Sequence, residues 1–288
     1  MAAAQCSFFQ EMVSDADTFF PGANPVTSWR FQSGTWKCGA NLPLDDRAFR
    51  YGMSVFETIA VAGGCPLFLD GHLDRLRRAA CARGWRNPCV PDDLPDSAHG
   101  RDERATGVFR LYLTAGPGGA GDPPSGSVFA LFEDCEVGTD FPPLRLVSSA
   151  VPYLPGSGGW KTGNYWQNVE ASVFARSTGA DDALLFSPDG CLVSASMGNV
   201  FVERDGAWTT PALGTGARDG VVRDWAIKNL PVEETLLDAG AVANATACFV
   251  TNSRIGIRPV GELDGRALRP GIGALQRLYR EQILRQIS

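Results

Sequence analysis

Lysine is scarce in this sequence, so each lysine can be weighed as a candidate reactive group. The chain has only Lys37, Lys161 and Lys228, and most of its basic side chains are arginine. Lys161 follows Gly159-Trp160 and precedes Thr162-Gly163, where small residues leave room for a ligand and an aromatic ring can exclude water. Loss of water lowers the pKa of a lysine amine, which suits a nucleophile or a Schiff-base lysine. On the local sequence alone, an ordinary exposed loop lysine is the favoured interpretation.

Three other segments carry groups that can hold an anion. Gly220 to Arg223 follows a turn-rich stretch and begins an expected helix, whose free backbone N–H groups can bind a phosphate. Thr251 to Arg254 ends an expected strand with hydroxyl and amide donors, which suit an anion or a simple turn. Arg75 lies on an expected helix among polar neighbours and would by itself predict a solvated face. Each of these signals is weak alone.

The apolar pattern of the first half predicts strands followed by a helix. Strand-like runs at 55–61 and 65–69 flank Gly63-Gly64, a combination typical of a hairpin. The apolar residues of the next segment share one face of a helix: Leu69, Leu73, Leu76 and Ala80. Further strands are expected at 108–115 and 127–132. The pattern therefore predicts an α+β fold for this half.

The second half repeats the α+β character after a polar segment that contains Pro142-Pro143. Its expected strands lie at 144–151, 183–186, 199–203 and 247–251, and its expected helices at 164–177, 220–229 and 272–287. We predict an N-terminal extension over 1–22, a small α+β domain over 23–136, a linker over 137–143, and a larger α+β domain over 144–288 that carries Lys161. A chain of 288 residues is long enough for two such cores.

Composition narrows the function classes. A net charge of -6 and a pI near 5.0 argue against a nucleic-acid partner. No apolar run is long enough to span a membrane, and no signal peptide is evident, so a cytoplasmic location is expected. The eight cysteines are scattered and are expected to be reduced and mostly buried or incidental. With only His72 and His99 present, no metal site is expected, and His72 is interpreted as a structural helix residue.

The order of several short segments is similar to that of a known family, the class IV aminotransferases. That family includes branched-chain and D-amino-acid aminotransferases and 4-amino-4-deoxychorismate lyase. The resemblance covers about residues 40 to 265 and rests on Asp45–Gly52, Val55–Thr58, His72–Leu76, Lys161–Tyr165, Gly179–Ala183, Asp189-Gly190, Asn199–Phe201, Thr210-Pro211, Gly220–Arg223 and Pro259-Val260. Each match is weak alone, but their order makes coincidence a poor explanation.

The resemblance implies a D-amino-acid aminotransferase-like (fold-type IV) architecture, pyridoxal 5'-phosphate bound between two domains, and a homodimer. It makes Lys161 the catalytic lysine, which would carry the cofactor as a Schiff base and move the proton at the substrate Cα. The implied cofactor ligands are Arg75, Tyr165, Ser194, Ser253 and the N–H groups of Val221 and Val222, and the implied substrate ligands are Arg110 and Arg254.

The sequence departs from the family pattern at two positions. Ser194 occupies the place of a glutamate that pairs with the cofactor ring nitrogen, and a hydroxyl stabilises a protonated ring less well than a carboxylate does. Ala115 stands where relatives often carry an arginine before the glycine-rich loop.

Three functions stay open at this point. The first is an aminotransferase acting on a small amino acid and a 2-oxo acid. The second is a lyase like 4-amino-4-deoxychorismate lyase, which releases pyruvate. The third is a non-catalytic or cofactor-free protein, and the presence of Lys161 together with Arg75 and the Gly220 helix start counts against it.

Overall fold

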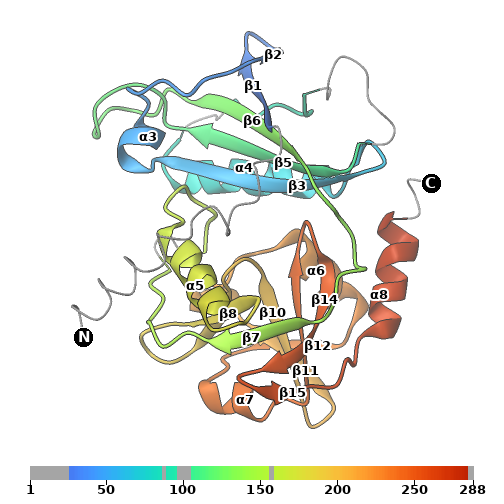
Figure 1. The fold of residues 1–288 in the computed structure, drawn as a ribbon. Helices are drawn as coiled ribbons and strands as arrows, with labels where there is room; N and C mark the ends of the chain where they lie inside the picture. The colour runs from blue at the N-terminus through green and yellow to red at the C-terminus, as the bar shows by residue number, and fades with distance from the viewer. Residues whose placement is uncertain (1–25, 86–88, 96–104, 156–158, 285–288) are drawn as a thin grey trace.

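The computed structural model describes residues 26–85, 89–95, 105–155 and 159–284 (Figure 1). The predicted N-terminal extension, residues 1–22, lies outside the described residues. The described chain folds into two sheets with helices packed against them, so the α+β prediction is confirmed. No helix of the described chain is long and apolar enough to cross a membrane.

The first sheet has six strands in the order β2-β1-β6-β5-β3-β4, and every neighbouring pair is antiparallel. Its strands are β1 (Val26–Gln32), β2 (Thr35–Cys38), β3 (Ser54–Ala62), β4 (Cys65–Pro66), β5 (Gly107–Thr114) and β6 (Ser127–Asp134). Helix α4 (Leu69–Ala82) packs against β3 and buries Leu73, Leu76 and Ala80, three of the four residues predicted to share its apolar face. Helix α3 (Arg47–Tyr51) is capped by the side chain of Asp46.

The second sheet has nine strands and is mixed. Its order is β12-β11-β10-β13-β14-β7-β8-β9, with β15 also paired to β14. The strands are β7 (Leu144–Ser148), β8 (Asp182–Phe186), β9 (Leu192–Ala195), β10 (Asn199–Arg204), β11 (Ala207–Pro211), β12 (Val232–Thr235), β13 (Ala247–Asn252), β14 (Gly256–Leu263) and β15 (Arg266–Ala267). The pairs β7 with β8, β7 with β14, and β11 with β12 are parallel.

Helices pack against this second sheet. They are α5 (Trp166–Ser177), α6 (Val221–Asn229), α7 (Ala239–Ala243) and α8 (Gly273–Tyr279), with a 3-10 turn at Leu213–Thr215 and a π-helical turn at Arg280–Leu284. The connection from β6 to β7 runs along the side of the molecule that carries α8 (Figure 1). Arg280 donates to the hydroxyl of Thr139, a residue of this connection, at 2.6 Å. The division into domains 23–136 and 144–288 with a linker over 137–143 stays a prediction.

Residues 161 to 163 join the two sheets. The N–H of Phe56 on β3 donates to the carbonyl of Lys161 at 2.9 Å, and the N–H of Gly163 donates to the carbonyl of Ser54 at 3.0 Å. A Cβ at Gly163 would lie 2.3 Å from the Ser54 hydroxyl oxygen, so a larger residue here would force the Ser54 side chain to move. The backbone of Lys161 is thereby fixed against the first sheet.

Some expectations need correction. The hairpin of β1 and β2 was not predicted, the expected strand 144–151 ends at Ser148, and the expected helix from residue 272 changes to a π-helical turn at Arg280. Four of the described cysteines are exposed, namely Cys38, Cys65, Cys81 and Cys89, so of the two expected alternatives, mostly buried or incidental, the first is wrong. They lie on edge strands, an exposed helix face and a loop, and of the cysteines that the structure describes only Cys248, on strand β13, is buried.

Candidate active site

Lys161 lines a cavity of about 650 Å³ whose wall includes residues from both sheets. Its Nζ atom lies 4.7 Å from the ring centre of Phe56 and 5.7 Å from that of Tyr165. No residue in the described part of the chain gives this amine a hydrogen bond or an ion pair. Burial, helped by the positive charge of Arg218, lowers the pKa of Lys161 to about 7. A substantial fraction of this amine is therefore uncharged near neutral pH and can act as a nucleophile, unlike the amine of an exposed loop lysine.

The start of α6 forms an anion cradle beside this cavity. Gly220 is the N-cap residue and supplies no side chain, so the first N–H groups of the nine-residue helix, including those of Val221 and Val222, have no capping acceptor. Asn199 holds the preceding turn by donating to the carbonyl of Arg218 at 2.8 Å. A Cβ at Gly220 would lie 2.2 Å from the amide oxygen of Asn199, so a larger residue here would displace the Asn199 side chain that holds the turn.

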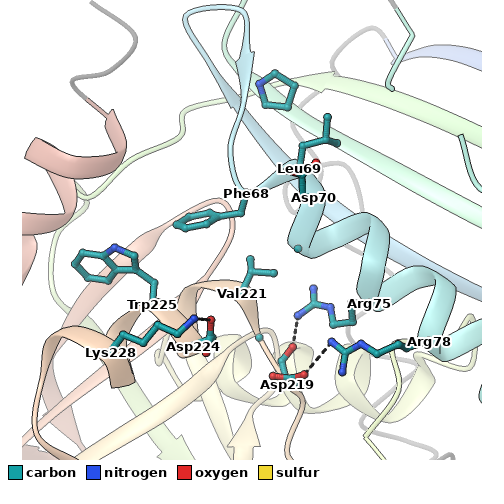
Figure 2. A pocket seen from close by; sticks show the side chains of 13 residues that line it. Phe68, Leu69, Asp70, Arg75, Arg78, Asp219, Val221, Asp224, Trp225 and Lys228 are labelled. Atoms are coloured by element: carbon teal, nitrogen blue, oxygen red, sulfur yellow. Dashed lines mark hydrogen bonds and ion pairs between the residues drawn. The ribbon is translucent and has the colours of Figure 1, made fainter. Parts of the chain in front are cut away.

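Arg75 connects α4 to this cradle. Its Nε atom donates to Glu57 Oε1 at 2.7 Å, its Nη2 atom pairs with Glu57 Oε2, and its Nη1 atom donates to the carbonyl of Asp219. Figure 2 shows Arg75 reaching from α4 toward Asp219, the residue before the N-cap of α6. The solvated face that the local sequence suggested for Arg75 is absent, because the side chain is largely buried against Glu57.

The sequence did not predict that Glu57 and His72 belong to the network around Arg75. His72 Nδ1 lies 2.8 Å from Glu57 Oε2, and His72 Nε2 lies 3.3 Å from the hydroxyl oxygen of Ser253. His72 was interpreted as a structural helix residue, yet it links Glu57 on β3 to the turn after β13. The available signal was the pairing of a charged residue in an apolar strand with a histidine on the apolar face of the following helix.

Opposite charges hold Glu57 ionised. Burial raises the pKa of this carboxyl, but the charge of Arg75 and the hydrogen bonds from Arg75 and His72 outweigh it and lower the pKa to about 2. Burial lowers the pKa of His72, against the hydrogen bond and charge of Glu57. The pair therefore consists of an ionised carboxylate and a neutral imidazole at neutral pH.

Arg218 is a third group that the sequence did not single out. Its guanidinium carbon lies 4.7 Å from the ring centre of Tyr165, and Nη1 donates to the Tyr165 hydroxyl at 2.6 Å. The same cation lowers the pKa of Lys161. Arg218 thus fixes Tyr165 in the cavity wall and favours the neutral amine of Lys161.

The remaining predicted site residues also line the cavity. Arg110, on β5, is half-exposed and donates to Glu133 at 2.7 Å. Arg254 donates to the carbonyl of Glu136 at 3.1 Å and lies 5.8 Å from the ring centre of Phe141. Ser194 lies on β9 and is 9% exposed. The structure therefore brings all nine predicted residues to one cavity: Arg75, Arg110, Lys161, Tyr165, Ser194, Val221, Val222, Ser253 and Arg254.

A buried hydroxyl in the same wall is unpaired. The Oγ1 atom of Thr251, on β13, has no hydrogen-bond partner in the described part of the chain, although the residue is 1% exposed. Leaving a buried hydroxyl without a partner is costly.

A second cavity, of about 760 Å³, shares five lining residues with the first: Arg75, Arg78, Asp219, Gly220 and Val221. Figure 2 shows it between Phe68 at the start of α4 and Trp225 on α6. The lysine in its wall, Lys228, is paired with Asp224 at 2.7 Å. The cavity that contains Lys161 is the better candidate for chemistry, because its amine is unpaired within the described chain.

The pKa of Lys161 leads to a measurable prediction. In the cofactor-free protein, we expect the rate of Lys161 modification by trinitrobenzenesulfonate to fall about tenfold per pH unit below pH 7 and to level off above pH 8, because only the neutral amine reacts. Arg218→Gln should move this inflection upward by removing a nearby positive charge. Peptide mapping separates the three lysines of the chain, and Lys37 and Lys228 serve as internal controls. An inflection near the usual lysine pKa would contradict the prediction.

The family profile described as "Amino-transferase class IV" matches residues 54–263, which include every residue of the site. The chain belongs to the class IV aminotransferase family. Among its relatives, a putative branched-chain-amino-acid aminotransferase from Methanocaldococcus jannaschii is 28% identical over 247 residues, covering 80% of this chain and 85% of the relative. An aminodeoxychorismate lyase from Bacillus subtilis is 27% identical over 268 residues, covering 84% and 89%.

Solved structures agree with this assignment. A putative 4-amino-4-deoxychorismate lyase from Legionella pneumophila superposes with a TM-score of 0.76 at 26% identity, covering 86% of this chain and 96% of that one. The predicted fold-type IV architecture and family are confirmed. The protein is an enzyme of this pyridoxal-phosphate-dependent family, which contains both aminotransferases and lyases and acts on amino acid and 2-oxo acid substrates.

Proposed function

We propose that this enzyme binds pyridoxal 5'-phosphate in the Lys161 cavity and uses it to transfer an amino group between a small amino acid and a 2-oxo acid. The observation that carries the proposal is the position of Lys161, a buried amine with a pKa of about 7 in the same cavity as the α6 anion cradle. When bound, the cofactor supplies an electron sink for bonds at the substrate Cα.

Each protein group has a distinct proposed task. Lys161 holds the cofactor covalently and moves a proton at the substrate Cα, as its lowered pKa allows. Arg75, Ser253 and the N–H groups of Val221 and Val222 bind the phosphate.

Tyr165, held by Arg218, is proposed to lie beside the phenolic oxygen of the cofactor. Arg110 and Arg254 are proposed to bind the substrate carboxylate, since both are basic groups in the cavity wall.

Ser194 favours a second candidate function, a lyase that releases pyruvate. Strand β9 carries the Ser194 hydroxyl and no carboxylate. A hydroxyl stabilises a protonated cofactor ring nitrogen less well than a carboxylate does. Elimination draws electrons toward a leaving group, so it depends less on a strong electron sink. The relatives also include aminodeoxychorismate lyases.

Two assays on the cofactor-loaded protein separate these functions. Amino-group transfer from glutamate or alanine to a panel of 2-oxo acids is the result expected for the aminotransferase. Pyruvate release from aminodeoxychorismate without an acceptor would replace that proposal with the lyase. If neither reaction occurs and no visible cofactor band forms, the pyridoxal-phosphate proposal itself is wrong.

Ser194→Glu tests whether residue 194 contacts the cofactor ring. We expect the visible spectrum of the loaded protein to change during turnover, because a carboxylate at this position would favour a protonated ring nitrogen. Ser194→Gln is the matched control, since it adds similar volume without the charge. Identical spectra for the wild type and the glutamate variant would place the ring nitrogen away from residue 194.

We also propose a homodimer that buries an exposed apolar surface on α3 and α5. Phe49 on α3 is 63% exposed and Trp166 at the start of α5 is 72% exposed. The two helices lie on the same side of the molecule (Figure 1), and Gly52 at the end of α3 approaches Asn164 before α5. Large exposed apolar side chains that gather in one region are typical of an association surface.

A charge placed on this surface is expected to dissociate the dimer. Trp166→Glu should convert the protein to a monomer in light-scattering measurements, because an unpaired carboxylate would be buried in the interface. Leu236→Glu is the control, since Leu236 is 68% exposed but lies between β12 and α7. A dimer that persists in the Trp166→Glu variant would assign the interface to another surface.

A further inference from the structure

His72 is a fully buried titratable group to which the proposed reaction assigns no task. It lies between two oxygen atoms on opposite sides of its ring. Nδ1 is 2.8 Å from Glu57 Oε2, and Nε2 is 3.3 Å from Ser253 Oγ. His72 therefore connects an ionised carboxylate to a hydroxyl that lines the Lys161 cavity.

The ionised state of Glu57 decides where the ring proton lies. A carboxylate with a pKa of about 2 is an acceptor only, so Nδ1 of His72 must carry a hydrogen. In a neutral imidazole the other nitrogen, Nε2, is then an acceptor. The single hydroxyl proton of Ser253 is consequently donated to His72.

This arrangement conflicts with phosphate binding at Ser253. A phosphate dianion accepts hydrogen bonds and has none to give, so Ser253 can assist it only by donating its hydroxyl proton to it. If the proton turns to the phosphate while His72 stays neutral, Nε2 becomes a buried acceptor without a donor, which carries the full desolvation penalty. A proton added to Nε2 removes the conflict.

We propose that His72 takes up one proton from solvent when a phosphate group binds against Ser253, so that Nε2–H donates to Ser253 and the Ser253 hydroxyl donates to the phosphate. The inference rests on the proposed function, because the phosphate is that of the cofactor. No covalent bond changes, and the protein gains one proton for each phosphate bound. His72 is a positioning residue, because it acts on the ligand through Ser253.

The charges around His72 are compatible with this change of state. Glu57 from β3 faces the ring with a negative charge, Arg75 on the same helix is positive, and Lys161 across the cavity adds a positive charge only when it is protonated. Burial and these positive charges lower the pKa of His72 in the ligand-free protein, against the opposing effect of Glu57. A dianion held beside Ser253 adds a second negative group and therefore favours the imidazolium.

Nitrogen-15 spectra of the histidine rings give a direct test. The chain has only two histidines, and His99→Gln leaves His72 as the single imidazole signal. The probe is 4-deoxypyridoxine 5'-phosphate, which keeps the ring and the phosphate but has no aldehyde to react with Lys161. At pH 8 we expect one protonated ring nitrogen in the free protein and two in the complex. A complex in which one nitrogen stays unprotonated overturns the inference.

Ser253→Ala is the matched control for the link between the two sites. It removes the hydroxyl that connects His72 to the phosphate, so His72 should stay neutral in its complex with the probe. Protonation of His72 in this variant as well would mean that the anion acts on His72 directly, and the proposed relay through Ser253 would be wrong.

The pH dependence of binding provides a second readout. Between the pKa of His72 in the free protein and its higher pKa in the complex, the affinity of the wild type for the probe should fall about tenfold per pH unit, since one proton is bound with the ligand. His72→Gln keeps hydrogen-bonding capacity but cannot take up a proton, so its affinity should be lower and should fall less steeply with pH than that of the wild type, because any protonation of Lys161 is common to both proteins. Equal slopes for both proteins would contradict proton uptake at His72.

The experiment separates failure of this inference from failure of the proposed function. If pyridoxal phosphate gives a visible band and the probe binds while His72 stays neutral, only the proton uptake is wrong. If neither ligand binds, the cofactor site is wrong and the inference falls with it.

Discussion

Replacing Lys161 with alanine is expected to abolish turnover and the visible cofactor band while leaving the fold intact. The amine is the proposed covalent anchor and the proposed proton carrier at the substrate Cα. A positioned acid or base alone contributes roughly 10²–10⁴-fold to a rate, so we expect kcat to fall by at least about 10³-fold. The visible spectrum and the single-turnover rate measure the two losses separately.

The structure supplies the reasons to expect an intact fold and suitable controls. The contacts that join residues 161 to 163 to β3 are made by backbone atoms, and alanine preserves them. Removing a cation with a lowered pKa from a buried position should not destabilise the protein. Lys37→Ala and Lys228→Ala should retain the band, because both side chains are exposed and neither lines the Lys161 cavity. A Lys161→Ala protein that keeps the band would remove the basis of the proposed function.

The parts of the site that sequence could predict are those coded within one short segment. Gly220 marks the start of α6 because its neighbours form a turn and then a helix. The strands β3, β5, β6, β10 and β13 were also predicted to within a few residues, because their apolar runs are long and bounded by turn residues.

The missed parts depend on contacts between distant segments. His72 meets Glu57 across 15 residues and Ser253 across 181, and no local pattern sets those distances. Arg218 meets Tyr165 across 53 residues, so its role in the Lys161 environment followed only from the folded chain. The exposed cysteines illustrate the same limit, because the burial of a small side chain depends on what packs over its strand or helix.

Glu57 is the residue whose loss is expected to destabilise the protein most. It is 1% exposed and neutralises Arg75 while it orients His72. Removing one partner of a buried ion pair costs about 3–5 kcal/mol, because the other charge is left without compensation. Glu57→Ala should therefore lower the free energy of unfolding by about that amount in urea titrations.

Glu133→Ala is the matched control, since Glu133 also pairs with an arginine of the first sheet but both side chains are about one-third or more exposed. We expect a loss of about 0–1 kcal/mol there, as is usual for exposed pairs. Similar losses for the two variants would mean that burial does not strengthen the Glu57 contacts.

The pH dependence of the same measurement tests the cause of the effect. The pKa of Glu57 is lowered from 4.5 to about 2 in the folded protein, so the unfolded chain binds this proton first as the pH falls. The contribution of Glu57 is then complete above pH 4.5 and declines as the pH falls from 4.5 toward 2. The difference between wild type and Glu57→Ala should shrink across that window, whereas a difference that is constant down to pH 2 would point to lost packing instead of lost charge.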